Sequence, residues 1–222
     1  QVLHADRALK KNGDPRGITN VVFMGMGEPL LNFEAVMGAV DVLKDDFGFG
    51  LSKRRITVST AGVVPGIQKM CGTTDVALAI SLHSPRDVVR SELVPINRKY
   101  PIAELIKVCK EYLSTIGDRR SVTVEYTLME GINDSVEDAR ELAQLLRSLR
   151  CKINLIPFNP FPASSYSRSN RAAIEAFQNS LINSGYTTML RKTRGEDIDA
   201  ACGQLVGQVQ DRTRRAERYH RA

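Results

Sequence analysis

The sequence has 222 residues, of which 42% are hydrophobic and 25% charged, and its formal net charge is +6 at pH 7. A chain of this size buries one substantial core, and no stretch approaches the roughly 18 uninterrupted apolar residues of a membrane helix. The first residues also lack the apolar core of a signal peptide, so we expect a cytoplasmic protein with no membrane partner. The positive charge favours a polyanionic partner, with nucleic acid as a candidate.

The chain begins at Gln1 in a helical pattern, which we interpret as the start of a fragment. Six runs rich in apolar and β-branched residues then predict strands, over 20–24, 55–60, 75–82, 121–129, 151–157 and 186–192. Apolar residues at helical spacing predict helices over 33–46, 101–117 and 134–149. The last helix has Asp134 as the expected N-cap, with Glu137 completing a capping box. This alternation favours β/α units around a mainly parallel sheet in an α/β fold.

Polar residues stand where several of these predicted strands end. They are Gly27 with Glu28, Ser59 with Thr60, Ser81, His83 and Asn159. In barrels and open sheets of β/α units, ligands bind beyond the carboxyl ends of the strands. We therefore expect these residues to converge on one face of the fold.

Glu28 lies in the run GMGEPL, directly after two glycines. The run begins like a dinucleotide-binding fingerprint, but Pro29 and Leu30 stand where that fingerprint needs a glycine and a helix start. Two interpretations remain for this carboxylate. It is either a solvated residue in a tight turn, or an acceptor for an ammonium group whose approach the glycines permit.

His83 and Asn159 also have plain structural explanations. A lone histidine at a strand end is more often a capping or core residue than a ligand, and Asn159 precedes a proline in a typical turn dipeptide. Ser59, Ser81 and His83 supply the residue types of a serine hydrolase, but the G-x-S-x-G nucleophile elbow is absent from the sequence. A hydrolase is therefore the weaker interpretation.

The four cysteines, at positions 71, 109, 151 and 202, have no metal-binding spacing, so each is first expected to be a small buried hydrophobe. Cys202 differs because acidic and basic residues surround it, and a thiolate near cations is nucleophilic. It belongs to a tail, 191–222, with eight Lys or Arg against five Asp or Glu. Such a tail is either a solvated basic segment or a contact for phosphate groups.

Six segments together resemble one family. They are GMGEPLLN, STAGVVP, AISLHSP, LVPINRKY, INLIPFNPFP and RKTRGEDIDAACGQL. In this order they resemble the RlmN-type dual-specificity RNA methyltransferases, a radical S-adenosylmethionine (SAM) family that also includes the Cfr resistance enzymes. The resemblance implies a partial (β/α) barrel of the radical SAM type over residues 1–222, with the basic tail at its end.

The resemblance also implies an activity, which is methylation of carbon 2 of adenine in 23S rRNA and tRNA. SAM and a [4Fe-4S] cluster would be the cofactors, a flavodoxin-like protein the electron donor, and the protein a monomer. Cys202 matches the cysteine that carries the methyl group. The positions that match SAM-binding residues are Gly27, Glu28, Ser59, Ser81, Leu82, His83 and Asn159.

The sequence departs from the family pattern in one respect. The C-x-x-x-C-x-x-C motif that ligates the cluster and the cysteine that resolves the protein–RNA bond are both missing, so we expect no metal ligands in this chain. We expect that the piece alone does not cleave SAM. The alternatives are a non-radical barrel enzyme that uses Glu28 and His83 as acid and base, a non-catalytic RNA-binding remnant, and methylation of carbon 8 in place of carbon 2.

Overall fold

The fold, taken from a computed structural model, is built on one six-stranded sheet in which every pair of neighbouring strands is parallel. The structure describes residues 1–117, 120–161 and 164–191. The strands lie in the sheet in the order of the chain. They are β1 (Val21–Phe23), β2 (Ile56–Thr60), β3 (Ala77–Ser81), β4 (Val122–Leu128), β5 (Cys151–Pro157) and β6 (Thr188–Leu190).

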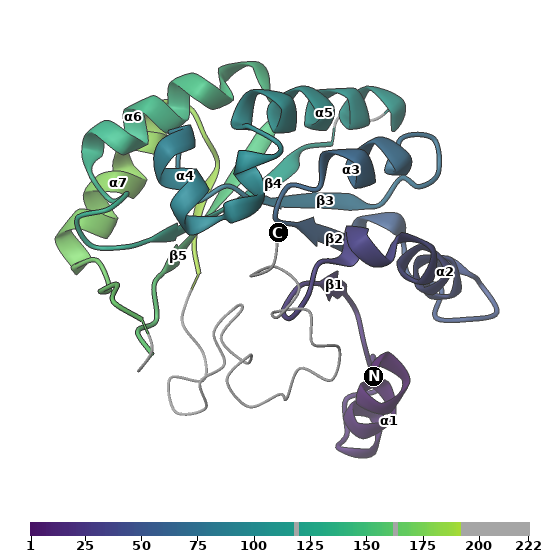
Figure 1. The fold of residues 1–222 in the computed structure, drawn as a ribbon. Coiled ribbons are helices and arrows are strands. Elements are labelled where there is room, and N and C mark those ends of the chain that lie inside the picture. Colours follow the sequence, from purple (N-terminus) through teal and green to yellow (C-terminus); the bar gives the residue numbers. More distant parts are fainter. Residues whose placement is uncertain (118–119, 162–163, 192–222) are drawn as a thin grey trace, which may run out of the picture.

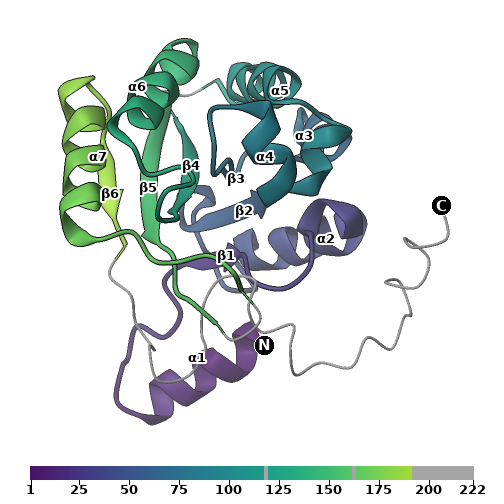
Figure 2. The same ribbon diagram turned by 60° about the vertical axis from the view of Figure 1, so that its left-hand side comes forward.

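Helices connect the strands and cover the outer face of the sheet in an arc (Figure 1). The α-helices are α1 (Val2–Lys11), α2 (Phe33–Lys44), α3 (Val64–Met70), α4 (Asp87–Leu93), α5 (Ile102–Thr115), α6 (Val136–Leu145) and α7 (Arg171–Asn183). Short 3-10 turns are η1 (Pro29–Asn32), η2 (Lys53–Arg55), η3 (Pro95–Arg98) and η4 (Leu146–Ser148). Helix α1 lies apart from the arc, and none of its residues is buried (Figure 2).

The strand order decides the architecture. A doubly wound sheet reverses its strand order, whereas here each strand pairs with its successor and the helices stay on one side. Right-handed connections repeated in this way curl a parallel sheet into a barrel. The α/β partial barrel expected from the sequence is therefore confirmed. None of the described helices is long and apolar enough to cross a membrane.

The two faces of the sheet differ in chemistry because side chains alternate along a strand. On β3 and just after it, Ile80 and Leu82 are fully buried in the hydrophobic core with the helices, whereas Ser81 and His83 line a cavity on the other face. On β4, Tyr126 packs in the core against Phe177 of α7, with ring centroids 5.1 Å apart. The outer face thus supplies the core, and the inner face supplies the polar groups.

The start of α6 differs from the expectation by one residue. Ser135 is the N-cap, its hydroxyl accepts a hydrogen bond from the Asp138 N–H at 3.0 Å, and Asp138 accepts from the Ser135 N–H at 3.1 Å. The Asp134 carboxylate accepts instead from the Gly131 N–H in the preceding turn. The predicted cap at Asp134 with Glu137 is therefore wrong, because the sequence holds two overlapping capping patterns and the turn takes up the first aspartate.

Among the described cysteines, Cys109 is fully buried, as expected, whereas Cys71 and Cys151 are half-buried. Burial raises the pKa of the Cys109 and Cys151 thiols to about 12, and it also raises the pKa of Cys71. All three side chains are therefore protonated at neutral pH, so they are poor metal ligands and poor nucleophiles. Cys202 lies outside the described residues.

Candidate functional site

A cavity of about 210 Å³ opens at the carboxyl ends of the strands. The structure brings to it six of the residues singled out in the sequence, which are Gly27, Glu28, Ser59, Thr60, Ser81 and His83. They come from the loop after β1, from β2, and from the end of β3. A second, more open hollow of about 730 Å³ beside β1 and α1 shares Gly27 and Glu28 with the first, so the two meet at this loop.

The other three predicted residues lie differently. The Leu82 side chain is fully buried on the helix side of the sheet, and its backbone N–H donates to the Glu125 carbonyl oxygen at 3.0 Å. A contact between a ligand and Leu82 would therefore involve its backbone. Asn159 follows β5 by two residues and is half-buried, but it does not line the cavity. Cys202 lies outside the described residues. The SAM-binding and catalytic roles predicted for eight of these residues stay predictions.

The Glu28 carboxylate is held in place by two backbone groups. Its Oε1 accepts from the Leu30 N–H at 3.1 Å, so Glu28 caps η1, and its Oε2 accepts from the Ala61 N–H at 2.7 Å. Gly27 has a φ of +83°, a conformation that other residues rarely adopt, and a Cβ there would meet no atom within 4 Å. A carboxylate has about four lone-pair sites, so Glu28 retains acceptor capacity toward the cavity.

Helix α3 supports this loop from behind through a close contact. A Cβ built on Gly66 would lie 2.5 Å from the Leu30 Cβ, so only glycine allows α3 to approach η1 this closely. Leu30 is 5% exposed and belongs to the core. The packing of Leu30 on Gly66 therefore fixes the turn that carries Glu28.

Arg90 of α4 ties the ends of β2 and β3 together under the cavity. Its buried guanidinium donates to the carbonyl oxygens of Ala61 at 2.6 Å, Ser81 at 3.0 Å and Leu82 at 3.1 Å, and to Asn97 Oδ1 at 2.7 Å. Burial lowers the pKa of Arg90 to about 10, so the group stays charged at neutral pH. No simple sequence pattern indicated that Arg90 would be buried and would bind these carbonyl groups. The residue lies in a short helix whose charged residues are typical of a surface segment.

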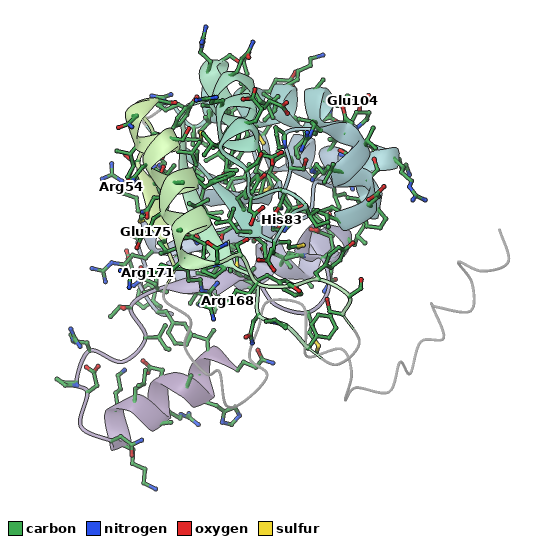
Figure 3. All side chains as sticks on the ribbon, turned by 90° about the vertical axis from the view of Figure 1, so that its left-hand side faces the viewer. Arg54, His83, Glu104, Arg168, Arg171 and Glu175 are labelled. Atoms are coloured by element: carbon green, nitrogen blue, oxygen red, sulfur yellow. The ribbon has the colours of Figure 1, made fainter. Side chains whose placement is uncertain are left out.

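His83 has an unusual backbone conformation and a neutral ring. Its φ is +60°, its Nδ1 accepts from the Thr127 N–H at 3.0 Å, and its carbonyl oxygen accepts from Asn133 Nδ2 at 2.7 Å. Burial, and then the positive charge of Arg90, lower the pKa of His83 to about 4. The ring is therefore neutral at pH 7, with its proton on Nε2, and Figure 3 shows it near the centre of the view. Such a group donates a hydrogen bond but is poorly matched to acid–base catalysis near neutral pH.

Glu125 of β4 is a cavity residue that sequence reasoning missed. It is 5% exposed, its Oε2 accepts from Asn154 Nδ2 at 2.8 Å, and burial raises its pKa. The signal was present in the run VTVEYTL, where Thr123, Glu125 and Thr127 alternate with apolar residues. Period-two polar residues in a strand whose other face is buried indicate a polar interior face.

Metal ligands do not gather in the described ranges. Within residues 1–117, 120–161 and 164–191, no group of three or more His, Cys, Asp or Glu side chains could hold a metal ion. The C-x-x-x-C-x-x-C motif is also missing from the sequence.

The model of one family matches residues 4–146, and this family is the radical SAM superfamily. The chain belongs to this superfamily. Two curated relatives are named dual-specificity RNA methyltransferase RlmN. The one from Marinomonas sp. is 58% identical over 211 residues, which is 95% of this chain and 57% of the relative. The one from Marinobacter nauticus is 59% identical over 220 residues, which is 99% of this chain and 60% of the relative.

A solved radical SAM methyltransferase from Sphaerobacter thermophilus has a similar structure, with a TM-score of 0.86 and 48% sequence identity. The alignment covers 91% of this chain and 59% of that one. The chain thus spans a little more than half the length of these three relatives. The resemblance seen in the sequence is confirmed, and so is the partial barrel of the radical SAM type.

Membership of the radical SAM superfamily implies two cofactors, SAM and a [4Fe-4S] cluster. The residues that line the cavity fit SAM by their chemistry, because an oriented carboxylate with free acceptor capacity, a neutral imidazole and glycine backbone converge there. The described residues do not fit the cluster, since they offer no set of ligands for it.

Proposed function

We propose that this chain is the SAM-binding part of a radical SAM enzyme that methylates carbon 2 of adenine in 23S rRNA and tRNA. The identity of 58% and 59% to proteins named RlmN supports the reaction and its substrates. The observation that carries the proposal within the structure is the Glu28 carboxylate, oriented by the Ala61 N–H at 2.7 Å at the mouth of the cavity.

In this proposal Glu28 accepts hydrogen bonds from the ammonium group of SAM, and Gly27 lets the methionine part approach the backbone. Ser59, Ser81 and the neutral Nε2–H of His83 offer hydrogen bonds to the rest of the molecule. When bound, SAM would supply the methyl group and the oxidising power for hydrogen abstraction. The chain's own residues bind and orient SAM and keep bulk water from it.

The remaining parts of the proposal concern residues outside the described ranges and other molecules. Cys202 would carry the methyl group to the RNA, and the basic tail 191–222 would contact its phosphates. A flavodoxin-like protein would supply the electron, and the enzyme would act as a monomer in the cytoplasm. The match to relatives named RNA methyltransferases supports RNA as the substrate.

The structure weighs against one of the alternative functions, the non-radical barrel enzyme. A non-radical barrel enzyme would need His83 as an acid or base, but its pKa of about 4 leaves it neutral and weakly basic at pH 7. An RNA-binding remnant would require neither Glu28 nor Cys202, so the test below separates it from the proposal.

A chimera provides the test. Residues 1–222 of this chain replace the matching region of the Marinomonas relative, and the chimera is produced without oxygen in cells that lack their own adenine carbon-2 methyltransferase. Mass spectrometry of 23S rRNA and tRNA should show 2-methyladenosine, and Cys202→Ala should abolish it. A chimera that carries the cluster and binds SAM but produces no 2-methyladenosine, or produces 8-methyladenosine, would contradict the proposal.

A further inference from the structure

A second carboxylate, that of Glu125, lines the same cavity as Glu28. Glu28 is bonded to Ala61, the residue directly after β2, and Glu125 lies on β4. Thr60 pairs with Ile80 and Ser81 pairs with Glu125, so Ala61, Ser81 and Glu125 lie at one level of the sheet. Since neighbouring strands are about 4.8 Å apart, the Ala61 and Glu125 backbones are separated by roughly 10 Å.

The Glu125 carboxylate has an incomplete set of hydrogen bonds. Oε2 accepts from Asn154 Nδ2, the side chain opposite it on β5, and among the described residues no donor is found for Oε1. The residue is 5% exposed and forms part of the cavity wall. The positive charge of Arg191, an exposed residue after β6, partly offsets the effect of burial on the pKa of Glu125. Burying a carboxylate with one hydrogen bond is costly, so this group favours a ligand that donates to it.

We propose that Glu125 is a binding residue for the ribose of a nucleoside ligand, with Oε1 accepting hydrogen bonds from the ribose hydroxyls. This rests on the proposed function, in which the ligand is SAM. The amino group and the ribose hydroxyls of SAM lie at opposite ends of its methionine chain, so one molecule reaches both carboxylates. Once Glu28 takes the ammonium group of SAM, the ribose diol and the adenine amino group are the donors left. The diol lies nearer to the methionine chain, so it is the donor that we place at Glu125.

A purely structural role makes a different prediction. If Glu125 only completes the sheet interior, a neutral isostere relieves the cost of a buried charge, and ligand affinity changes alike for every nucleoside. If Glu125 binds ribose, its effect on affinity depends on the hydroxyls of the ligand. The two roles are therefore separated by ligands that differ in one hydroxyl group.

The test measures binding by isothermal titration calorimetry to the cluster-loaded chimera. The ligands are S-adenosylhomocysteine and its 2′-deoxy and 3′-deoxy analogues. Glu125→Ala should lower the affinity for S-adenosylhomocysteine about tenfold, which is the effect of losing one hydrogen bond to a charged group. It should leave the affinity for at least one deoxy analogue at the wild-type value, because that analogue has already lost the contact.

Two controls keep the result interpretable. Glu130→Ala changes an exposed glutamate that follows β4 and should alter no affinity by more than about twofold. Glu125→Gln keeps one acceptor and the shape of the side chain, and it should retain more affinity than Glu125→Ala even if the alanine variant folds poorly. Equal weakening of all three ligands by Glu125→Ala, or no weakening at all, would overturn the inference.

The inference and the proposed function fail separately. A chimera that binds S-adenosylhomocysteine without any dependence on Glu125 overturns the ribose contact and leaves the methyltransferase proposal standing. A chimera that shows the ribose dependence but makes no 2-methyladenosine overturns the proposed function and leaves the ribose contact. If the unmodified chimera binds no S-adenosylhomocysteine, both are overturned.

Discussion

Glu28 Oε2 and the Ala61 backbone N–H lie 2.7 Å apart, and this hydrogen bond joins the loop after β1 to the end of β2. Ala61 is also held from its other side, since its carbonyl oxygen accepts from the Arg90 guanidinium at 2.6 Å. The carboxylate is therefore oriented by the fold before any ligand arrives. Binding residues held in this way lose little conformational entropy when the ligand binds.

Replacing Glu28 with glutamine should weaken SAM binding to the cluster-loaded chimera by about ten- to a hundredfold, because a charge-assisted hydrogen bond to an ammonium is lost. The amide also cannot accept from both the Leu30 and the Ala61 N–H groups. Calorimetry gives the affinity. The matched control is Glu34→Gln in the first turn of α2, an exposed position, and equal losses in the two variants would refute a special role for Glu28.

Alanine at Gly66 should destabilise the fold and weaken SAM binding, whereas alanine at Gly38 should not. The new Cβ at Gly66 would lie 2.5 Å from the Leu30 Cβ, and overpacking costs about 1–3 kcal/mol. At Gly38, in the exposed part of α2, a Cβ meets nothing within 4 Å, so alanine should stabilise by about 0.5–1 kcal/mol. Urea unfolding measures both, and a stabilised Gly66→Ala variant would disprove the packing argument.

Lysine at Arg90 should lower the free energy of unfolding by about 3 kcal/mol, because an ammonium cannot reach all the acceptors that the guanidinium serves. SAM affinity should also fall, since Ala61 is no longer held against Glu28. Arg98→Lys, at an exposed position in η3, should change stability by less than about 0.5 kcal/mol. Similar unfolding curves for the two variants would exclude the proposed role of Arg90.

His83 should make the protein less stable in acid. Its pKa falls from 6.5 to about 4 on folding, so the unfolded state binds more protons between these values. Its effect on stability is constant above pH 6.5 and becomes unfavourable as the pH falls toward 4, by up to about 3 kcal/mol.

His83→Asn isolates this effect, because asparagine tolerates positive φ and its Oδ1 can accept from the Thr127 N–H. Urea unfolding at pH 7 and pH 4.5 gives the stability difference between wild type and variant. Wild type should lose more stability on acidification than the variant. A difference that is the same at both pH values would show that His83 does not titrate as described.

Much of the fold could be read from the sequence because hydrophobic periodicity decides it. The predicted strands at 55–60 and 151–157 lie within one residue of β2 and β5, and the capping pattern before α6 was found with an error of one residue. The alternation of strands and helices was enough to predict a mainly parallel α/β sheet, whereas the partial barrel was predicted from the family resemblance. Strand ends are less certain, since whether a residue such as Asn20 or Leu82 still pairs depends on its neighbour in the sheet.

The residues of the candidate site were also predictable only in part. Glu28 and His83 could be found because they follow strands, but the register that places Glu125 level with Ser81 depends on pairing between segments 44 residues apart. Arg90 was unpredictable because three of its four acceptors are backbone carbonyls, which every residue has. Sequence patterns identify side-chain chemistry more readily than they identify which backbone groups need a partner.

The central claim is that Glu28 receives the ammonium group of SAM at the strand-end cavity. A crystal structure of the cluster-loaded chimera with SAM tests it most directly, by the distance between the amino nitrogen and the Glu28 carboxylate. The account predicts a hydrogen bond of about 2.7–2.9 Å, with the Ala61 N–H still bound to Oε2. SAM bound elsewhere, or bound here with its amino group directed away from Glu28, would contradict it.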